Sequence, residues 1–493
     1  VDILIKIISN NTQPEKKFAI DSLKMLQGSK VDNEIVSQLK KSSPPALVDL
    51  INISVERNIT AAIPELLKIC ASKEPDVKKK AFNAIGQLGE PSIIKDVVSI
   101  IINMENDAAQ DEAVSAVVSL AEKIKDTKRR SSVVLDQWQK AKTDLAKSSL
   151  LRIAGGIGDD TALQFLSKIA QQDDQPRLQE IAIREISGWQ DESAIPVLQG
   201  IYQKTKNQTY RTLAFRGYVR LLSSATKINT EEIIKHYEQA LNSSQNPDEK
   251  KQILAGLGNV PNEKALAIAL PLIEDNSVKS EAAQSILQIS ASIYGSNPSL
   301  AKTAINKVLA SNIDENLTKQ AKTILKQIET NIAYITLWEV AGPYFKEGNN
   351  YDALFNMVFP PEEGKTEVNW RLIPAGTNPK QPYIIDLLKF FGGEQRVAYA
   401  RTYIYSPTDQ NARLELGSDD GAKVWLNGEL VHSINAARPI TPDSDKVNIK
   451  LKKGWNSLLL KITQNNLGWE FCVKIVKQDG SPLDDIRFST KPD

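Results

Sequence analysis

Apolar residues recur every three to four positions over most of residues 1–330, a spacing that places them on one face of an α-helix. Leu163, Leu166, Ile169 and Ala170 form one such face. The apolar stretches are short, and polar or Gly- and Pro-containing turns separate them. The pattern therefore predicts a series of short helices throughout this part of the chain.

The predicted helices repeat with a regular period. Residues 152–163 align without a gap with residues 184–195 at an offset of 32, with Arg, Gly, Asp and Ala in matching places. Similar glycine-containing punctuation at 85–93 and 254–266 fits a unit of about 32–36 residues. A two-helix unit of this length cannot bury its own apolar face, so neighbouring units must stack into a solenoid. We expect the glycines to lie between paired helices, in left-handed turns.

This punctuation resembles that of HEAT-like repeats across residues 1–330, which implies an α-solenoid of about nine units and a surface for a protein partner. Residues 125–150 depart from the register and predict an insertion or a lengthened helix. Several arginines recur near the starts or inner faces of helices. They either line a ligand groove or, as the favoured interpretation, bind groups within the stack: Arg152, Arg184, Arg211, Arg216 and Arg220.

The hydrophobic period changes from about 3.6 to 2 near residue 336. Alternating or apolar runs predict seven strands, at 400–405, 413–416, 423–426, 429–432, 447–451, 457–462 and 469–475. Asn427-Gly428 between two of these runs indicates a tight hairpin. Residues 336–493 also hold 18 of the 30 aromatic residues and five of the seven tryptophans. The predicted fold class is a multidomain α and β protein, with an α-solenoid at 1–330 and an all-β, jelly-roll-like sandwich at 336–493.

Three segments of the second part carry a resemblance to known sugar-binding modules: 338–344, 417–428 and 453–456. They resemble protective-antigen-type lectin-like domains and the galactose-binding-like jelly rolls found in β-galactosidase-type hydrolases. The resemblance implies a sandwich that binds carbohydrate. In the lectin-like members, adjacent aspartates on a loop coordinate calcium, which implies Asp419 and Asp420 as metal ligands here.

Calcium requires six to eight oxygen ligands, and two carboxylates are too few. Asn427, Asp443 and Asp445 are the nearest further candidates, but nothing in the sequence brings them together. The alternative is that Ser418-Asp419-Asp420-Gly421 forms a tight turn in which the aspartates bind backbone amides. No other cofactor is indicated.

Four residues are candidates for carbohydrate binding: Trp425, Asn427, Trp455 and Trp469. Indole rings offer an apolar face on which a pyranose ring can stack. The alternative for Trp425 and Trp469 is the sandwich core, and the apolar neighbours Val424 and Leu426 favour the core for Trp425. Trp455, in a Lys-Gly-Trp-Asn turn, is the more exposed candidate.

Composition limits the chemistry. The chain has 61 basic and 60 acidic residues, and neither of its two parts has a large net charge, so a nucleic-acid partner is not expected. Two histidines and two cysteines cannot build a multi-histidine or cysteine-rich zinc site. Glu362-Glu363 and Asp484-Asp485 are sequence neighbours in loops, so we expect solvated charges rather than the paired acids of a glycosidase. No apolar run is long enough to span a membrane.

We therefore expect a non-enzymatic binding or scaffold protein, with a solenoid for protein contacts and a sandwich for carbohydrate or surface binding. The alternative is a structural assembly subunit, compatible with a homo-oligomer, in which the sandwich contacts proteins. The resemblance implies a periplasmic or extracellular location in a bacterium. The chain opens on Val1-Asp2-Ile3-Leu4-Ile5, which has the pattern of a helix interior, so any targeting segment is expected upstream.

Overall fold

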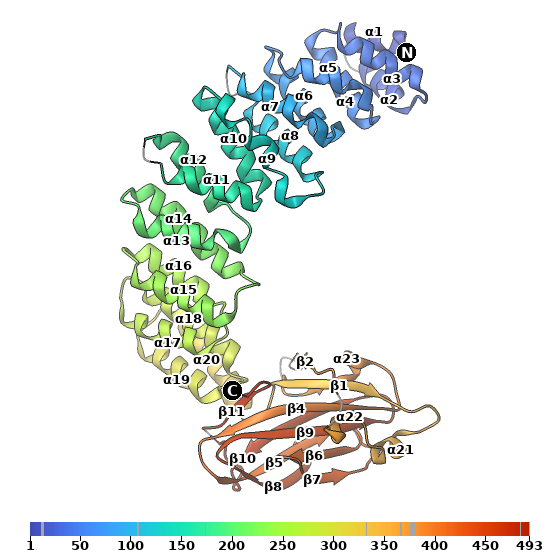
Figure 1. Cartoon of the computed structure of the whole chain (residues 1–493). Helices are drawn as coiled ribbons and strands as arrows, with labels where there is room; N and C mark the ends of the chain where they lie inside the picture. Colours follow the sequence, from blue (N-terminus) through green and yellow to red (C-terminus); the bar gives the residue numbers. More distant parts are fainter. Residues whose placement is uncertain are drawn as a thin grey trace. The chain divides into compact units, whose positions relative to one another are not determined.

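The computed structural model describes residues 1–10, 14–105, 108–172, 174–331, 333–364, 367–374, 381–483 and 485–492. The chain forms two compact units, Val1–Ile228 and Asn229–Asp493. Helices continue to Asn331, and the first strand begins at Trp338 (Figure 1). The predicted fold class is confirmed: a helical repeat region is followed by two antiparallel sheets.

The first unit consists of short helices that pack on their neighbours in sequence. Its α-helices are α1 (Asp2–Asn10), α2 (Glu15–Met25), α3 (Ser29–Leu39), α4 (Pro44–Glu56), α5 (Ile63–Ile69), α6 (Pro75–Leu88), α7 (Ile94–Ile102), α8 (Gln110–Glu122), α9 (Ser132–Leu135), α10 (Asp144–Ile157), α11 (Asp160–Ala170), α12 (Pro176–Ser187), α13 (Ile195–Lys204) and α14 (Gln208–Ser224). Helices α4, α6, α8, α10, α12 and α14 each contact the next of this set. This ladder of alternate helices is the stacking expected of a solenoid.

Half of the repeat glycines lie inside helices and half at helix ends, and the expectation of left-handed turns is wrong for all of them except Gly158. Gly158 does adopt a left-handed conformation, with φ of 70°, after the end of α10. Gly86 lies within α6, and a Cβ there would stand 3.1 Å from the Cα of Ala116 on α8. A Cβ on Gly217 of α14 would stand 2.8 Å from the carbonyl oxygen of Ser187. The glycine pattern therefore marks close approach of neighbouring helices.

The departure at 125–150 is an insertion of short turns. Two 3-10 turns, Thr127–Arg129 and Trp138–Lys140, flank the four-residue helix α9. The repeat arginines mostly bind groups nearby in the helical stack, as the favoured interpretation predicts. Arg152 pairs with Asp111 at 2.6 Å, and Arg211 donates to the Tyr202 carbonyl at 2.7 Å.

The second unit begins with six further helices: α15 (Thr230–Asn242), α16 (Pro247–Leu257), α17 (Glu263–Ala269), α18 (Lys279–Ile293), α19 (Pro298–Ala310) and α20 (Glu315–Asn331). The segment after α20 runs along the sandwich. The Ile335 amide donates to the Val473 carbonyl at 2.8 Å, and the Ile475 amide donates to the Ala333 carbonyl at 2.9 Å. The linker is thus hydrogen-bonded to a strand of the smaller sheet.

Two antiparallel sheets form the rest of this unit, and all seven predicted strands are present. The strands are β1 (Trp338–Tyr344), β2 (Arg371–Ile373), β3 (Ile385–Asp386), β4 (Arg396–Ser406), β5 (Gln410–Ser418), β6 (Ala422–Leu426), β7 (Glu429–Ile434), β8 (Asp445–Leu451), β9 (Gly454–Gln464), β10 (Glu470–Val476) and β11 (Arg487–Ser489). The larger sheet has the order β2-β1-β4-β9-β6-β7, with β11 also paired to β4. The smaller sheet has the order β3-β10-β5-β8. Sequence alternation did not predict four strands: β1, which is seven residues long, and β2, β3 and β11, which are three residues long or shorter.

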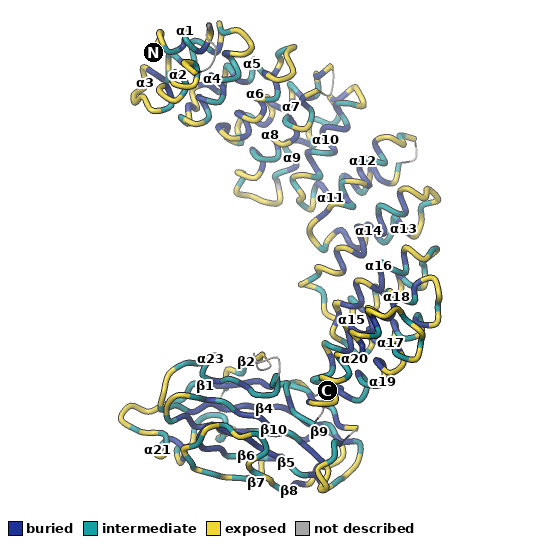
Figure 2. Tube along the Cα trace, turned by 180° about the vertical axis from the view of Figure 1, so that it is seen from behind, coloured by how far each residue is buried: buried dark blue, intermediate teal, exposed yellow. Residues whose placement is uncertain are grey.

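The core lies between the inner faces of the two sheets. Ala400, Leu460 and Val424 from the larger sheet and Phe471 and Leu416 from the smaller one are fully buried there. Figure 2 shows such buried positions recurring along the strands, as it does along the helices. Three short helices, α21 (Tyr351–Asn356), α22 (Pro360–Glu363) and α23 (Leu387–Phe391), interrupt the strands. Within the described part of the chain, no helix combines the length and apolarity needed to cross a membrane.

Asn456 of β9 joins the turn between β8 of the smaller sheet and β9 of the larger sheet to a hairpin of the larger sheet. Its buried side chain donates to the carbonyls of Lys452 at 2.8 Å and Gly454 at 3.1 Å, and accepts from the Lys452 amide at 2.9 Å. It also accepts from the side chain of Asn427 at 2.8 Å. These bonds connect the β8–β9 turn to the β6–β7 hairpin.

We predict that Asn456→Ala lowers the free energy of unfolding of the sandwich by roughly 2–4 kcal/mol, because buried backbone groups lose their partners. Tryptophan fluorescence during urea unfolding measures it, since five of the seven tryptophans lie in this region. Asn448→Ala, at an exposed position of β8, is the matched control and should change stability by less than about 0.5 kcal/mol. Equal effects of the two substitutions would contradict the role of Asn456.

Candidate functional site

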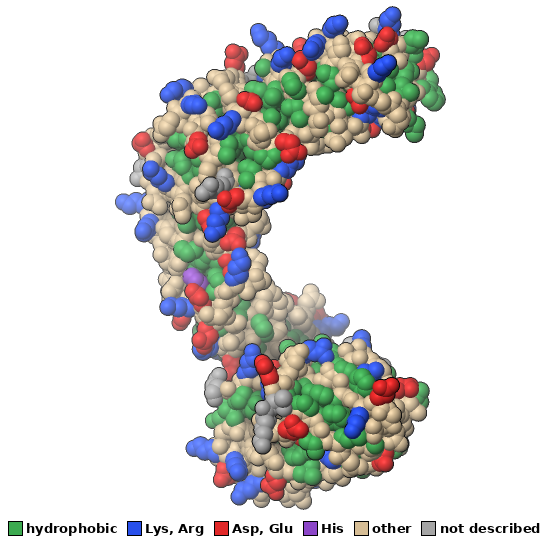
Figure 3. All heavy atoms as spheres, turned by 45° about the vertical axis from the view of Figure 1, so that its right-hand side comes forward, with side chains coloured by type: hydrophobic (Ala, Val, Ile, Leu, Met, Phe, Trp, Pro, Cys, Tyr) green, Lys and Arg blue, Asp and Glu red, His purple; other side chains and the backbone are tan. Residues whose placement is uncertain are grey.

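A cavity of about 560 Å³ opens on the outer face of the larger sheet. Its walls come from β4, β6 and β9, from α22 and from the loop that leads into β2. Aromatic and polar side chains share the lining: Trp370, Tyr403, Trp425, Arg401, Glu362 and Ser457. We call this the outer-face pocket. Figure 3 shows hydrophobic side chains gathered among scattered charged ones on the sandwich.

Strand alternation explains which side chains reach this pocket. Trp425 pairs with Leu459, Leu459 pairs with Arg401, and Arg401 pairs with Glu339, so the four form one row across four strands. Their neighbours along the strands, such as Val424 and Leu458, are buried in the core. Successive side chains on a strand point to opposite faces, so the row faces outward.

Trp425 is therefore not a core residue, and the prediction of a core position from its apolar neighbours is wrong. Val424 and Leu426 are 0% and 5% exposed, and both point inward. Two inward neighbours place the residue between them on the outer face, where Trp425 is half-buried and lines the pocket.

The arginine of the pocket is neutralised and held in place. The Nη2 and Nε atoms of Arg401 lie 2.8 and 2.9 Å from Oε2 of Glu339. Its guanidinium also lies over the Trp370 ring, 4.3 Å from the ring centre. Such stacking is favourable for a cation. The stacking contact holds Trp370 in place as a wall of the pocket, and the ion pair with Glu339 compensates the charge of Arg401.

Glu362 forms a second compensated group, and the expectation that it is a solvated charge is wrong. Its Oε1 accepts from Nζ of Lys461 at 2.8 Å and from the hydroxyl of Tyr399. Lys461 Nζ also donates to the Met357 carbonyl. The Lys461 side chain is fully buried, and burial lowers the pKa of its ammonium although Glu362 acts in the opposite direction. The pair ties α22 to the sheet and so fixes one side of the pocket.

The other three predicted carbohydrate-binding residues lie in different surroundings. Asn427 is exposed in the β6–β7 hairpin, with φ of 52°, and accepts from the Ser457 amide at 2.9 Å. Trp455 is half-buried on the outer face, beside Tyr405. Trp469 is fully buried in the core, and its indole N–H donates to the Ile462 carbonyl at 3.3 Å. A ring without an exposed face has no surface for a sugar, so Trp469 is not part of the site.

Asp419 and Asp420 follow β5 and are 8% and 4% exposed. The two carboxylate oxygens of Asp420 accept from the backbone amides of Asn465 at 2.5 Å and Arg438 at 3.2 Å. Asp420 itself has φ of 62°, as a turn residue does. These contacts match the turn interpretation of this segment.

The residues present do not fit a calcium site. Among the described residues, no group of three or more His, Cys, Asp or Glu side chains is placed to hold a metal ion. The further candidate ligands, Asn427, Asp443 and Asp445, bind other protein groups. Asp445 binds Arg438 at 2.9 Å, and Asp443 binds Lys474 at 2.7 Å.

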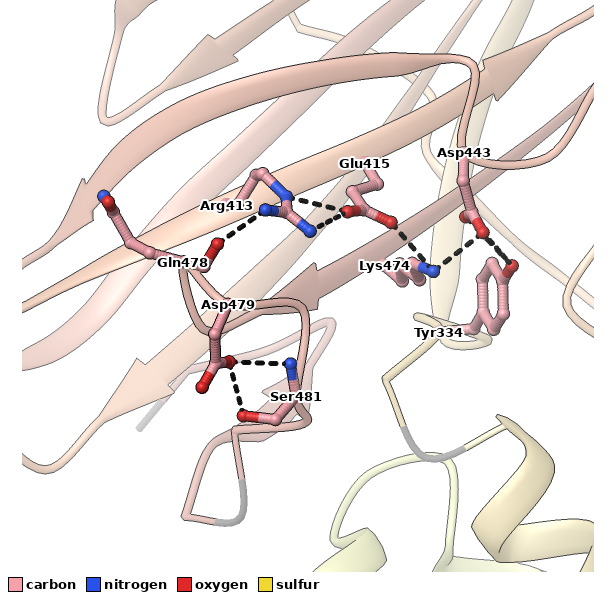
Figure 4. Close-up of polar contacts among 8 residues, drawn as sticks. All are labelled: Tyr334, Arg413, Glu415, Asp443, Lys474, Gln478, Asp479 and Ser481. Carbon is pink, nitrogen blue, oxygen red and sulfur yellow. Dashed lines mark hydrogen bonds and ion pairs between the residues drawn. The ribbon is translucent and has the colours of Figure 1, made fainter.

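Asp443 belongs to a charged network on the outer face of the smaller sheet (Figure 4). Lys474 of β10 lies between Asp443 and Glu415 of β5, and Glu415 also binds Arg413 at 2.6 Å. Asp443 accepts from the hydroxyl of Tyr334 in the linker at 2.9 Å. The charges compensate one another, so the network holds the linker on the sheet.

Of the six lining side chains named above, sequence reasoning missed all but Trp425: Trp370, Arg401, Tyr403, Glu362 and Ser457. Alternation along β4 could have placed Arg401 and Tyr403 on the same face, because both occupy outward positions of a predicted strand. Trp370 and Glu362 lie in irregular segments with no period to signal their position.

No protein-family model matches the chain, and no curated protein matches it. Several solved or assembled structures are similar. A homology model of the full-length AP-3 complex is 14% identical, with 67% of this chain and 69% of that chain covered and a TM-score of 0.46. Kap121p is 11% identical, with 67% and 43% covered and a TM-score of 0.43. The CpcE–CpcF complex of phycocyanin lyase from Nostoc is 10% identical, with 48% and 93% covered and a TM-score of 0.24. Likenesses at this level carry no argument about function, which rests on the site itself.

The burial of Asp419 generates a pH-dependent prediction. Burial, and then the charge of Asp420, raise the pKa of Asp419 to about 6 from its ordinary 3.8. Because this pKa is raised in the folded state, the contribution of Asp419 to the free energy of unfolding is greatest below about pH 4 and is lost as the pH rises through 6. Asp419→Asn should therefore stabilise the sandwich at pH 8, by roughly 1–3 kcal/mol, and give no gain at pH 4.

Urea unfolding at the two pH values measures this difference. Asp485→Asn, at an exposed position, is the control and should change stability little at either pH. A stabilisation by Asp419→Asn that is equal at pH 4 and pH 8 would contradict the assigned cause.

Proposed function

We propose that this chain is a binding protein whose sandwich recognises carbohydrate in the outer-face pocket and whose helical repeats provide a scaffold for a protein partner. One observation carries the carbohydrate proposal: Trp370, Tyr403 and Trp425 line a single cavity whose charged groups are already paired. The volume of about 560 Å³ lies in the usual range for small-molecule sites.

The chemistry of the lining supports a sugar rather than an ion. Arg401 and Glu362 are compensated by Glu339 and Lys461, so neither offers a free charge to a ligand. Aromatic rings offer apolar faces, and the Ser457 and Tyr403 hydroxyls offer hydrogen bonds. A neutral ring with one apolar face and several hydroxyls matches both features. A periplasmic or extracellular location is the expectation that accompanies such a ligand.

The helical repeats support the scaffold part of the proposal through their architecture. Stacked repeats present a long surface built from many similar units, and solenoids commonly use such surfaces to bind other chains. The two parts of the proposal are separate, because the pocket lies wholly within the sandwich.

Trp425→Ala should weaken carbohydrate binding at least tenfold, because it removes one aromatic wall of the pocket. A glycan array with the wild-type protein identifies the sugar, and isothermal titration with that sugar measures the change. Phe345→Ala, at an aromatic residue that is 59% exposed outside the pocket, is the matched control and should leave affinity unchanged. Unchanged affinity in Trp425→Ala, or an array without signal, would overturn the carbohydrate proposal.

Self-assembly through the sandwich is a second candidate, favoured by apolar residues on edge strands. Leu372 on β2 is 60% exposed and Leu430 on β7 is 51% exposed. These strands form the two edges of the larger sheet, where backbone groups lack a neighbouring strand. A second copy of this chain can pair with such an edge and cover its apolar side chains.

Assembly predicts a molecular mass that rises with protein concentration in light scattering. Leu430→Lys should shift the equilibrium at least tenfold toward the monomer, because it places a charge on the edge. Lys446→Gln, at an exposed position of β8, is the control and should leave the mass unchanged. A monomer at every concentration would exclude this candidate.

A further inference from the structure

A second aromatic group lies on the same outer face, beyond the pocket. Tyr405 of β4 and Trp455 of β9 meet with ring centres 5.4 Å apart and planes at 68°. The guanidinium of Arg487 on β11 lies over the Tyr405 ring, 4.3 Å from its centre. All three residues are half-buried, so part of each side chain is open to solvent. We call this group the second row.

Strand register places the second row and the pocket on one continuous surface. Arg487 pairs with Tyr405, and Tyr405 pairs with Trp455, so the three residues share one face. Arg401 lies four positions before Tyr405 on β4 and therefore faces the same side. At about 3.3 Å per residue, the second row stands roughly 13 Å from the row of Arg401 and Trp425.

The surface between the rows is suited to a chain that continues from one to the other. Tyr403 of β4 and Ser457 of β9 pair with each other midway and line the pocket. Ser457 is exposed and Tyr403 is half-buried. The alternate residues, Thr402 and Leu458, are buried in the sandwich, so the outward side chains form an unbroken track.

Charge distinguishes the second row from the pocket. Arg487 forms no ion pair with a carboxylate in the described part of the chain, and neither do Lys452 and Lys453 in the turn just before Trp455. Both lysines are exposed. Among the described residues, these three cations in or next to the second row form no ion pair, and the nearby Asp409 carboxylate accepts from the Lys453 backbone amide at 2.7 Å. The charged residues of the pocket, in contrast, are paired.

We propose that the ligand is an extended, acidic polysaccharide segment that lies along β4, with one sugar ring in the outer-face pocket and a carboxylate-bearing residue at the second row. This rests on the proposed function of the pocket. A span of roughly 13 Å exceeds a single sugar ring, and stacking on Trp455 together with charge pairing to Arg487 would hold a later residue of the chain.

The test uses two oligosaccharide series, each of one, two, four and six residues: α-1,4-linked galacturonate and β-1,4-linked glucose. Isothermal titration should show that the galacturonate hexamer binds at least tenfold more tightly than the monomer and more tightly than the glucose hexamer. The advantage of the acidic hexamer should shrink as salt is raised, because exposed charges are screened.

Two substitutions separate the second row from the pocket. Trp455→Ala should abolish the gain from chain length while leaving binding of the monomer unchanged. Arg487→Gln should weaken the galacturonate hexamer at least fivefold without affecting glucose oligomers. Lys450→Gln, which removes an exposed cation of the smaller sheet, is the matched control and should change neither series.

The outcomes distinguish this inference from the proposed function. If the monomer and the hexamer bind with equal affinity, or if neither Trp455→Ala nor Arg487→Gln changes binding, the proposal of an extended acidic ligand is overturned and the proposed function of the pocket is not. Failure of both series to bind, with Trp425-dependent binding of another glycan on the array, also overturns it and leaves the pocket intact. If the wild-type protein binds no glycan in either series or on the array, both the extended-ligand proposal and the proposed function of the pocket are overturned.

Discussion

A lysine that is fully buried on the outer face of a β-sheet must find a carboxylate, and in this chain that requirement positions the pocket. The side chain of Lys461 has no exposure, and Glu362 reaches it from α22 across 99 positions of sequence. Removing one partner of such a pair leaves an uncompensated buried charge, which typically costs about 3–5 kcal/mol. The pair therefore holds α22 against the sheet, and without it the outer face would lack one of the walls that make it a cavity.

Local periodicity predicted most of the fold because each element carries its own signal. The helices follow apolar positions at 3.6-residue spacing, and the hairpin at Asn427-Gly428 has the two positive φ angles, 52° and 83°, that this dipeptide favours. The pocket was predicted only in part, since Trp425 was recognised and Trp370 and Glu362 were not. These two residues reach the site through β1–β2 pairing and the bond to Lys461, which leave no local pattern.

Two motifs show how one sequence feature can serve different ends. The glycines of the repeats suggest left-handed turns, but several of them allow helices to approach, as Gly86 does beside Ala116. Adjacent aspartates occur both in calcium loops and in turns, and only the hydrogen bonds of Asp420 to backbone amides distinguish the two. In both cases the same residue type suits two different local geometries, and the sequence alone does not show which of the two is present.

The ion pairs around the pocket also bear on whether it favours recognition or hydrolysis. A glycosidase of the usual kind needs one acid to protonate the leaving group and a second carboxylate about 5–9.5 Å away as base or nucleophile. The carboxylate at the pocket wall, Glu362, is bound by Lys461 and Tyr399, and the nearby Glu339 is bound by Arg401. Groups committed to structural partners are poorly placed to transfer protons or attack a substrate. The same pairing leaves the aromatic rings as the principal features that a ligand meets, which supports the proposal of a pocket that binds a neutral sugar ring.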